Sequence, residues 1–501
     1  MKTQSRLKAI VISYAATVVR SISQIILTSL YIEKLGLDGY GFYQYVYSIA
    51  SCAIILDFGI SSVVNKYYIE FKEKGKRKEI ENALFYCLCI SLLAVMLIAA
   101  FGAIVLFNVE EIFGAMSVQK ASLTQQLFAF IVLYLSSLMI QHFFEGVILS
   151  QEKYITLKII SLAQILIKCV LIVVLLFGNV GVIAIAIGDF ASVFICLIFS
   201  AVYSFGTLKI KIKYHFYDKK LILSIIKLAS ALCVQSVILY LNTSIDKYVI
   251  GRILNDAAVS LYSIALTISL FFDEIPTVIQ RLYLPQAVKL VSNSASGEEL
   301  TDFIIKPGRY QFVLCGGIFG AFVLFGRDFI NIWTGITSYE SWLIALLLMA
   351  ASIVPLCQNV GLAILTAMNK RMFRSVCLGV AAFLNLLLTI ALVKKFGLLG
   401  APIGTFISLI ICNNIIMNFY YRRIGINIRR LFKEIFGKLL VVVFVTTAIS
   451  SALLFIRSTS LVLFGVKCII YVVVYAAVLW LIGLNKQEKS SIKNFLHLAE
   501  K

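Results

Sequence analysis

The sequence predicts an all-α polytopic membrane protein with about 14 transmembrane helices, arranged as two parallel six-helix lobes plus two C-terminal helices. Three observations predict this fold class. Of the 501 residues, 61% are hydrophobic and 14% are charged, which is too apolar for a soluble core within a polar surface. Apolar runs that reach the roughly 20 residues a spanning helix needs recur along the whole chain. The two halves of the chain also resemble each other at a constant offset.

The apolar runs are predicted to be helices because they lack the period-two alternation of membrane β-strands. The first run follows a basic start, but it is too long for a signal-peptide core and has no A-x-A cleavage site, so we expect it to be retained. The fourteen predicted spans are 10–31, 42–65, 83–107, 122–149, 155–177, 182–205, 223–244, 257–280, 309–330, 342–367, 375–393, 400–420, 438–456 and 461–484.

The basic residues predict the orientation of these spans. Of the 45 Lys and Arg residues, 32 lie at the N-terminus, in alternate loops and in the C-terminal tail, 8 lie in the opposite loops and 5 lie inside spans. Because cytoplasmic loops carry the excess of Lys and Arg, both termini are predicted to be cytoplasmic. The net charge of +20 is thereby explained by topology and contact with anionic lipids, and nucleic-acid binding is not indicated.

The cysteines give no sign of a disulfide framework or a metal centre. All eleven fall within predicted spans, without the spacing of zinc ligands. We therefore expect no metal and no cofactor.

An internal duplication organises the chain. Phe177 and Phe396 begin two Phe-Gly-x-x-Gly segments whose numbers differ by 219, and Tyr43 and Tyr262 differ by the same amount. Six spans separate the copies, so both run in the same direction, with a symmetry axis along the membrane normal. The predicted domains are a first lobe at 1–206, a second lobe at 207–425, and two extra helices with a tail at 426–501.

Polar side chains repeat along single faces of three spans and predict a cationic substrate cavity between the lobes. Charged groups inside a membrane are costly and are candidate functional residues by default, and three- or four-residue spacing places side chains on one helix face. The basic and amide residues on these faces that we assign to substrate binding are Arg20, Gln24, Lys168 and Lys227. Snorkelling to the interface is the alternative for Lys227 and for Lys158, a further lysine of the fifth span.

Acidic residues inside the spans are candidates for gating or ion coupling. They are Asp57, Glu145, Asp189 and Asp246. Asp57 is expected to face the cavity near Arg20, and Gly59, two residues later, is expected to be flexible. The alternative is that such an acid forms a buried ion pair that only holds two helices together, which we call a structural pin. His142 lies one turn before Glu145, and we expect it to make a helix–helix hydrogen bond rather than bind a metal.

Two stretches carry a family resemblance. "YIEKLGLDGYGFYQYVYSIASCAIILDFGISSVVNKYY" contains Leu-Gly-x-x-x-Tyr-Gly and then Leu-Asp-hydrophobic-Gly, and "SIDKYVIGRILNDAAVSLYSIA" contains Asp246, Lys247, Gly251 and Tyr262. These stretches resemble the Wzx-type polysaccharide repeat-unit flippases of the MATE-like multidrug/oligosaccharidyl-lipid/polysaccharide exporter superfamily.

The resemblance implies a multi-pass protein of the bacterial cytoplasmic (inner) membrane. It would translocate undecaprenyl-diphosphate-linked oligosaccharide repeat units to the outer leaflet for O-antigen, capsule or exopolysaccharide assembly. The implied partners are this lipid-linked oligosaccharide, membrane lipids and the polysaccharide polymerase with its chain-length machinery, and the coupling ion would be H⁺ or Na⁺.

Three alternative functions stay open. A multidrug or metabolite exporter of the same superfamily would favour an acidic cavity, whereas Arg20 and Lys168 make this one basic. A lipid II flippase has an equally anionic substrate, so charge does not separate it from the first interpretation. A membrane polysaccharide polymerase is an enzyme and usually needs a large outward domain or an acidic metal motif, which the predicted outward loops do not show. We therefore expect a transporter and not an enzyme.

Overall fold

The computed structural model describes residues 3–114, 116–368, 370–456, 460–486 and 488–490. These residues form helices joined by short links, with no strand among them. Twelve helical segments within the described ranges are long and apolar enough to cross a membrane. Two of them, Val19–Glu73 with 55 residues and Met372–Arg423 with 52, would each extend about 80 Å, more than twice the hydrocarbon thickness. Each therefore accounts for two crossings, which agrees with the predicted count of about 14.

Glycines at positive φ break both of these long segments. Gly36 lies inside α1 (Thr3–Ala50) with φ 71° and ψ 177°, and Gly397 ends α14 (Arg371–Phe396) with φ 61°. A side chain strongly disfavours these backbone conformations, so glycine permits the chain to reverse there. The Leu-Gly-x-x-x-Tyr-Gly and Phe-Gly-x-x-Gly patterns thus mark turns between consecutive crossings.

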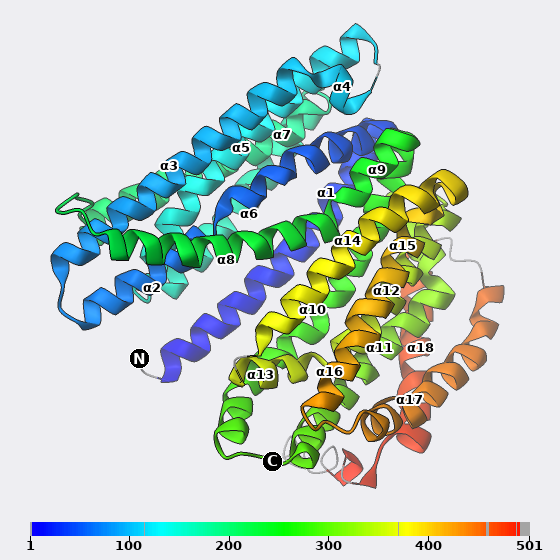
Figure 1. The fold of residues 1–501 in the computed structure, drawn as a ribbon. Helices are drawn as coiled ribbons and strands as arrows, with labels where there is room; N and C mark the ends of the chain where they lie inside the picture. Colours follow the sequence, from blue (N-terminus) through cyan, green and yellow to red (C-terminus); the bar gives the residue numbers. More distant parts are fainter. Residues whose placement is uncertain (1–2, 115, 369, 457–459, 487, 491–501) are drawn as a thin grey trace. The chain divides into compact units, whose positions relative to one another are not determined.

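The chain divides into two compact units, 1–260 and 261–501. In unit 1, α3, α5 and α7 run side by side (Figure 1). The elements of unit 1 are α1, η1 (Ser51–Asp57), α2 (Ile60–Glu73), α3 (Arg77–Phe107), α4 (Val109–Phe113), α5 (Val118–Ser150), α6 (Tyr154–Phe177), α7 (Ile183–Val202), η2 (Tyr203–Thr207), α8 (Lys219–Thr243), α9 (Ile245–Ile253) and the first turn of α10 (Asp256–Ser292).

Unit 2 contains the rest of α10 and all later elements. They are α11 (Gly297–Thr334), α12 (Tyr339–Cys357), α13 (Asn359–Ala367), α14, η3 (Gly397–Leu399), α15 (Gly400–Leu409), η4 (Ile410–Ile416), α16 (Met417–Arg423), α17 (Ile428–Ser450), η5 (Ser451–Phe455), α18 (Leu461–Val478) and η6 (Leu479–Gly483).

The helices follow the duplication seen in the sequence. Adding 219 to the residue numbers places α3 on α11, α5 on α12 and α13, α6 on α14, and α7 on α15 and α16. The Gly36 turn falls on the link between α9 and α10. The match of helix ends as well as residues supports a repeat of two six-helix lobes.

Helix α8 packs in unit 1, against η1, α2 and α3. Its Leu221, Ile225 and Ala229 are buried in one apolar cluster with Ile60 of α2 and Leu84 of α3. Compact units and repeats are therefore different divisions of the chain, because a repeat follows sequence correspondence and a unit follows packing. The predicted lobe bounds at 206 and 425 stay a prediction.

The last two spans pack on α11 within unit 2. Leu431, Ile435 and Leu439 of α17 share an apolar core with Phe312 of α11.

Arg309 of α11 is 6% exposed. Its guanidinium donates to both carboxylate oxygens of Glu488, at 2.7 and 3.0 Å, and to the carbonyls of Glu434 and Gly483. Burial alone would raise the pKa of Glu488, but the hydrogen bonds from Arg309 and from the Asn485 backbone lower it below its ordinary value. This buried ion pair fixes the chain beyond η6 to unit 2.

Candidate functional site

The second crossing of the membrane is interrupted near its middle. The 3₁₀ helix η1 ends at Asp57, Phe58 and Gly59 follow in the left-handed region with φ of 50° and 58°, and α2 resumes at Ile60. This break lies about halfway between the Gly36 turn and the end of α2 at Glu73. Broken helices leave backbone groups available and are tolerated in membranes where they are buried in protein or line a cavity.

Asp57 pairs with a histidine of α5. Its Oδ1 lies 2.7 Å from Nδ1 of His142, and the two side chains are 21% and 27% exposed. The expected helix–helix hydrogen bond of His142 is confirmed, with Asp57 as its partner. This contact stabilises a carboxylate that would otherwise be costly at this depth. The expected proximity of Asp57 to Arg20 stays a prediction.

The neighbouring residue of α5, Gln141, connects the candidate Glu145 with an amide of α6. Gln141 is 1% exposed, and its Nε2 donates to Oε1 of Glu145 at 3.2 Å and to Oε1 of Gln164 at 3.0 Å. Gln164 lies on α6, so this bridge carries the polar contacts from α5 to the next helix.

One turn further along α6, Lys168 forms an ion pair with Asp189 of α7. Lys168 Nζ lies 2.5 Å from Asp189 Oδ1, and the Tyr43 hydroxyl of α1 donates to Asp189 Oδ2 at 2.8 Å. The Lys168 side chain is 31% exposed and that of Asp189 is 10% exposed. Both oxygens of the carboxylate are therefore engaged, while the ammonium group keeps partial access.

These contacts form three groups in unit 1, which follow one another along α5 and α6 and which we together call the polar ladder. Its members are Tyr43, Asp57, Gln141, His142, Glu145, Gln164, Lys168 and Asp189. They come from α1, η1, α5, α6 and α7. The ladder contains two acid–base pairs and two amides. Lys168 and Asp189 form an ion pair, and Asp57 with His142 forms one when the imidazole is protonated.

Four of the eight predicted site residues belong to the ladder, namely Asp57, Glu145, Lys168 and Asp189. The other four lie on α1, α8 and α9: Arg20 and Lys227 are exposed, Gln24 is half-buried and Asp246 is buried. Their roles in substrate binding and coupling stay predictions.

Tyr43 is one of three ladder residues, with Gln141 and Gln164, that the sequence analysis did not assign to the site. Aromatic residues in a segment such as 40–47 favour anchoring at the membrane interface, and here Tyr40, Tyr43 and Tyr45 are at most 6% exposed. Their rings pack inside unit 1 and their hydroxyls bond there, so these side chains face protein, and their depth in the membrane stays a prediction. The available signal was that Tyr43 and Tyr47 are one helical turn apart, and their rings stack with centroids 5.9 Å apart.

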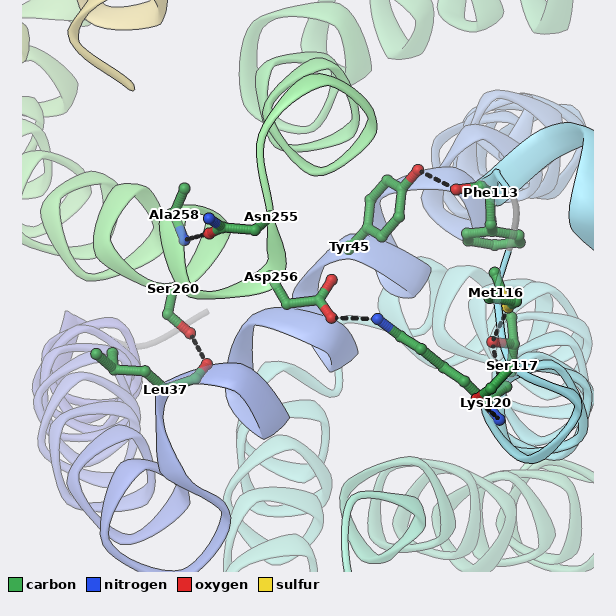
Figure 2. A network of polar contacts seen from close by, with 11 residues as sticks. Leu37, Tyr45, Phe113, Met116, Ser117, Lys120, Asn255, Asp256, Ala258 and Ser260 are labelled. Carbon is green, nitrogen blue, oxygen red and sulfur yellow. Dashed lines mark hydrogen bonds and ion pairs between the residues drawn. The ribbon is translucent and has the colours of Figure 1, made fainter. Parts of the chain in front are cut away.

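A second polar cluster lies at the end of unit 1 that contains the Gly36 turn (Figure 2). Lys120 Nζ lies 2.6 Å from Asp256 Oδ2, and the Tyr45 hydroxyl donates to the Phe113 carbonyl at 3.1 Å. Ser260 Oγ donates to the Leu37 carbonyl at 2.5 Å. The cluster connects the first turn of α10 to α1 and α5.

Two glycines of the family stretches serve this close packing. A Cβ on Gly41 would lie 1.7 Å from the Asp256 carbonyl oxygen, and one on Gly251 would lie 2.3 Å from the Tyr45 ring. These contacts leave no room for a larger residue. Nearby, Lys247 Nζ donates to Gln44 Oε1 at 2.9 Å, and burial lowers the pKa of Lys247 to about 8. Glycine at positions 41 and 251 of these stretches is thus explained by packing.

No group of three or more His, Cys, Asp or Glu side chains suited to a metal ion occurs among the described residues.

The fold and the ladder define a helical membrane protein built from two related six-helix repeats, the architecture of the MOP superfamily. One similar structure is that of a lipid II flippase MurJ in an inward closed conformation, with 15% identity, 94% of this chain and 98% of that chain covered, and a TM-score of 0.71. Another is an inward-facing multidrug resistance MATE family transporter of the MOP superfamily, with 12% identity, 83% and 96% covered, and a TM-score of 0.69.

Residues 7–281 match the family of polysaccharide biosynthesis proteins, and the chain belongs to this family. The matched region includes every residue of the polar ladder and of the Asp256 cluster. A search of curated protein sequences finds no match.

Proposed function

We propose that this protein is a flippase that moves undecaprenyl-diphosphate-linked oligosaccharide repeat units from the cytoplasmic to the outer leaflet by alternating access. The observation that carries the proposal is Lys168, a partly accessible cation within a span, which forms an ion pair with Asp189. Membership of the polysaccharide biosynthesis family supports the substrate class.

The chemistry of the substrate fits this cation. A lipid diphosphate brings negative charge into the hydrocarbon, where charge needs a partner. A lysine ammonium group provides a mobile point charge for phosphate oxygens. Arg20, Gln24 and Lys227 are proposed as further groups that contact the substrate.

Coupling is proposed to act through the acids. A proton on Asp189 removes the charge that holds Lys168 and frees the ammonium for phosphate; Na⁺ near the carboxylate would compete in the same way. The Asp57–His142 pair and Glu145 provide further sites for a proton, and Asp246 is proposed to act with them. This mechanism uses ion exchange and needs no bond-breaking chemistry, so we propose a transporter and not an enzyme.

The proposed setting is the bacterial inner membrane, with both termini in the cytoplasm, as the distribution of basic residues predicts. The product would be O-antigen, capsule or exopolysaccharide, and the proposed partners are the polymerase and its chain-length machinery. Lipid II is the alternative substrate, because it carries the same diphosphate.

Replacing both members of the ion pair tests the proposal. Lys168→Gln alone leaves Asp189 unpaired, which costs about 3–5 kcal/mol for a buried pair, so loss of function in that variant would be ambiguous. Lys168→Gln/Asp189→Asn removes both charges together. We expect near-normal amounts of folded protein in the membrane and the loss of most surface polymer.

The measurement is surface polymer per unit of membrane-extracted protein, together with the leaflet distribution of the lipid-linked units. Lys153→Gln is the matched control, since Lys153 is exposed just before α6. Normal polymer together with normal lipid II transport in the double variant would refute the proposed role of Lys168. Loss of lipid II transport with intact polymer would identify the alternative substrate.

A further inference from the structure

Unit 2 contains a cavity of about 960 Å³, well separated in sequence from the polar ladder. It lies between the end of α12, the η4–α16 segment and the start of α17. Its lining includes Asn414, Asn418, Phe419, Arg422 and Arg429. These helix ends are at the side of the membrane where the basic residues gather, which the sequence predicts to be cytoplasmic.

Two arginines give the cavity an uncompensated positive charge. Arg422 and Arg429 are exposed, and neither forms a salt bridge within the part of the chain that the structure describes. The adjacent Arg430, by contrast, pairs with Asp302 at 2.6 Å and with Glu434 at 2.8 Å. No acidic residue is among the described residues that line the cavity. An anion is therefore the ligand that this charge favours.

An amide with an unused acceptor lies beside this charge. Asn414 is 8% exposed, and its Oδ1 has no hydrogen-bond partner among the described residues. Asn418 is already engaged, because its Nδ2 donates to the Asn414 carbonyl at 2.6 Å and its Oδ1 accepts from Gln358 at 2.9 Å. A buried acceptor without a donor is uncommon and costly, so a ligand hydroxyl would complete the site.

The remaining part of the lining is apolar. Phe419 is 67% exposed and Ile415 is 48% exposed, as expected for side chains of a spanning helix that contact lipid. Arginines, a free amide acceptor and lipid-facing apolar side chains thus meet in one cavity. Basic pockets between spanning helices on the cytoplasmic side are known to bind anionic lipid headgroups.

We propose that this cavity binds the headgroup of a lipid phosphate that also carries hydroxyl groups. Arg422 and Arg429 bind the phosphate oxygens, Asn414 Oδ1 accepts a hydrogen bond from a hydroxyl group, and the chains lie along Phe419. Two lipids share this chemistry: a phosphatidylglycerol-type phospholipid, and a lipid-linked sugar diphosphate. Only the second source rests on the proposed function.

Lipid retention by the purified full chain tests the site. Protein is reconstituted in phosphatidylcholine nanodiscs that contain a small fraction of phosphatidylglycerol, phosphatidylethanol or undecaprenyl-diphosphate-linked sugar, and the co-purifying lipid is measured by mass spectrometry. We expect Arg422→Gln/Arg429→Gln to weaken retention about tenfold, through the loss of charge-assisted hydrogen bonds to phosphate. Arg423→Gln is the matched control, because Arg423 is exposed on the same helix and does not line the cavity.

Asn414→Leu tests the hydroxyl contact separately. Phosphatidylglycerol and phosphatidylethanol carry the same charge, but only the first has headgroup hydroxyls, so the wild type should prefer it and the variant should not.

Specific retention of phosphatidylglycerol identifies a phospholipid site, and specific retention of the sugar diphosphate identifies a second substrate site. Equal losses in Arg423→Gln and the double variant, or no preference for hydroxyl-bearing lipids, would overturn the proposal. Because retention is measured without transport, failure of the flippase proposal leaves this test unaffected.

Discussion

Asp57 shows how a charged side chain is accommodated in a spanning segment. It ends a 3₁₀ helix at a break in the helix, and its carboxylate contacts His142 Nδ1 at 2.7 Å. The partner is an imidazole, whose charge depends on a proton. The pair therefore has two states, a neutral histidine that donates to a carboxylate and a full ion pair, and the difference between them is one proton.

Asp57→Asn separates a transport role from a structural role. Asn retains the size of the side chain and an acceptor for His142 but removes the charge. If the charge serves transport, surface polymer per unit of extracted protein should fall by most of its value while the protein stays folded. If Asp57 is a pin, the loss of a buried pair costs about 3–5 kcal/mol, and the variant should be depleted from the membrane.

Asp38→Asn is the control for this experiment, because Asp38 is an exposed acid of α1, the helix that leads into η1. The double variant Asp57→Asn/His142→Gln leaves no titratable group in the pair. We expect it to be stable and inactive. Wild-type output from Asp57→Asn would show that transport does not need the carboxylate charge.

At the scale of elements, the break between η1 and α2 depends on Gly59 and on its contact with α8. Gly59 has φ 58°, and a Cβ there would lie 2.5 Å from Leu232 Cδ1 and 2.8 Å from Leu232 Cβ. The helix therefore approaches α8 at a position where only glycine fits. The geometry that presents Asp57 to α5 and the packing of α8 on unit 1 are thus linked through one residue.

Gly59→Ala should destabilise the protein. The left-handed backbone costs a non-glycine residue about 1–2 kcal/mol, and the contact with Leu232 adds to this cost, so we expect a total of at least about 2 kcal/mol. Adding Leu232→Ala should relieve the contact and recover part of the loss. The measurement is thermal unfolding of the detergent-solubilised protein.

Gly437→Ala provides the comparison. Gly437 lies in α17 with no heavy atom within 4 Å of a Cβ and no positive φ, so the change should leave stability unaltered or raise it by up to about 1 kcal/mol. If both alanine variants unfold at the wild-type temperature, the break does not need glycine.

At the scale of the whole molecule, local patterns and long-range contacts differ in how far the sequence reveals them. Hydropathy, glycine turns and the repeat offset are properties of short windows, and the spans and breaks predicted from them agree with the helices. The pairing of Asp57 with His142, 85 residues away, depends on which helices become neighbours, and no window of the sequence contains that information. For the same reason, the contact of Tyr43 with Asp189 and the packing of α8 in unit 1 were not foreseen.

The number of crossings decides on which side of the membrane each link lies. If Val19–Glu73 and Met372–Arg423 each crossed once, the link at Gly75 would lie opposite the N-terminus. Two crossings each, with turns at Gly36 and Gly397, place Gly75 and Gly425 on the same side as both termini.

Alkaline phosphatase, which is active only outside the cytoplasm, should be inactive when fused after Gly75, Gly425 or Glu488 and active after Gly181 or Gly335. A cytoplasmic reporter at the same positions should give the reverse pattern, which guards against fusions that are inactive because they are degraded. Phosphatase activity after Gly75 with none after Gly181 would contradict two crossings in the first segment, and with them the 32-to-8 distribution of basic residues as a measure of orientation.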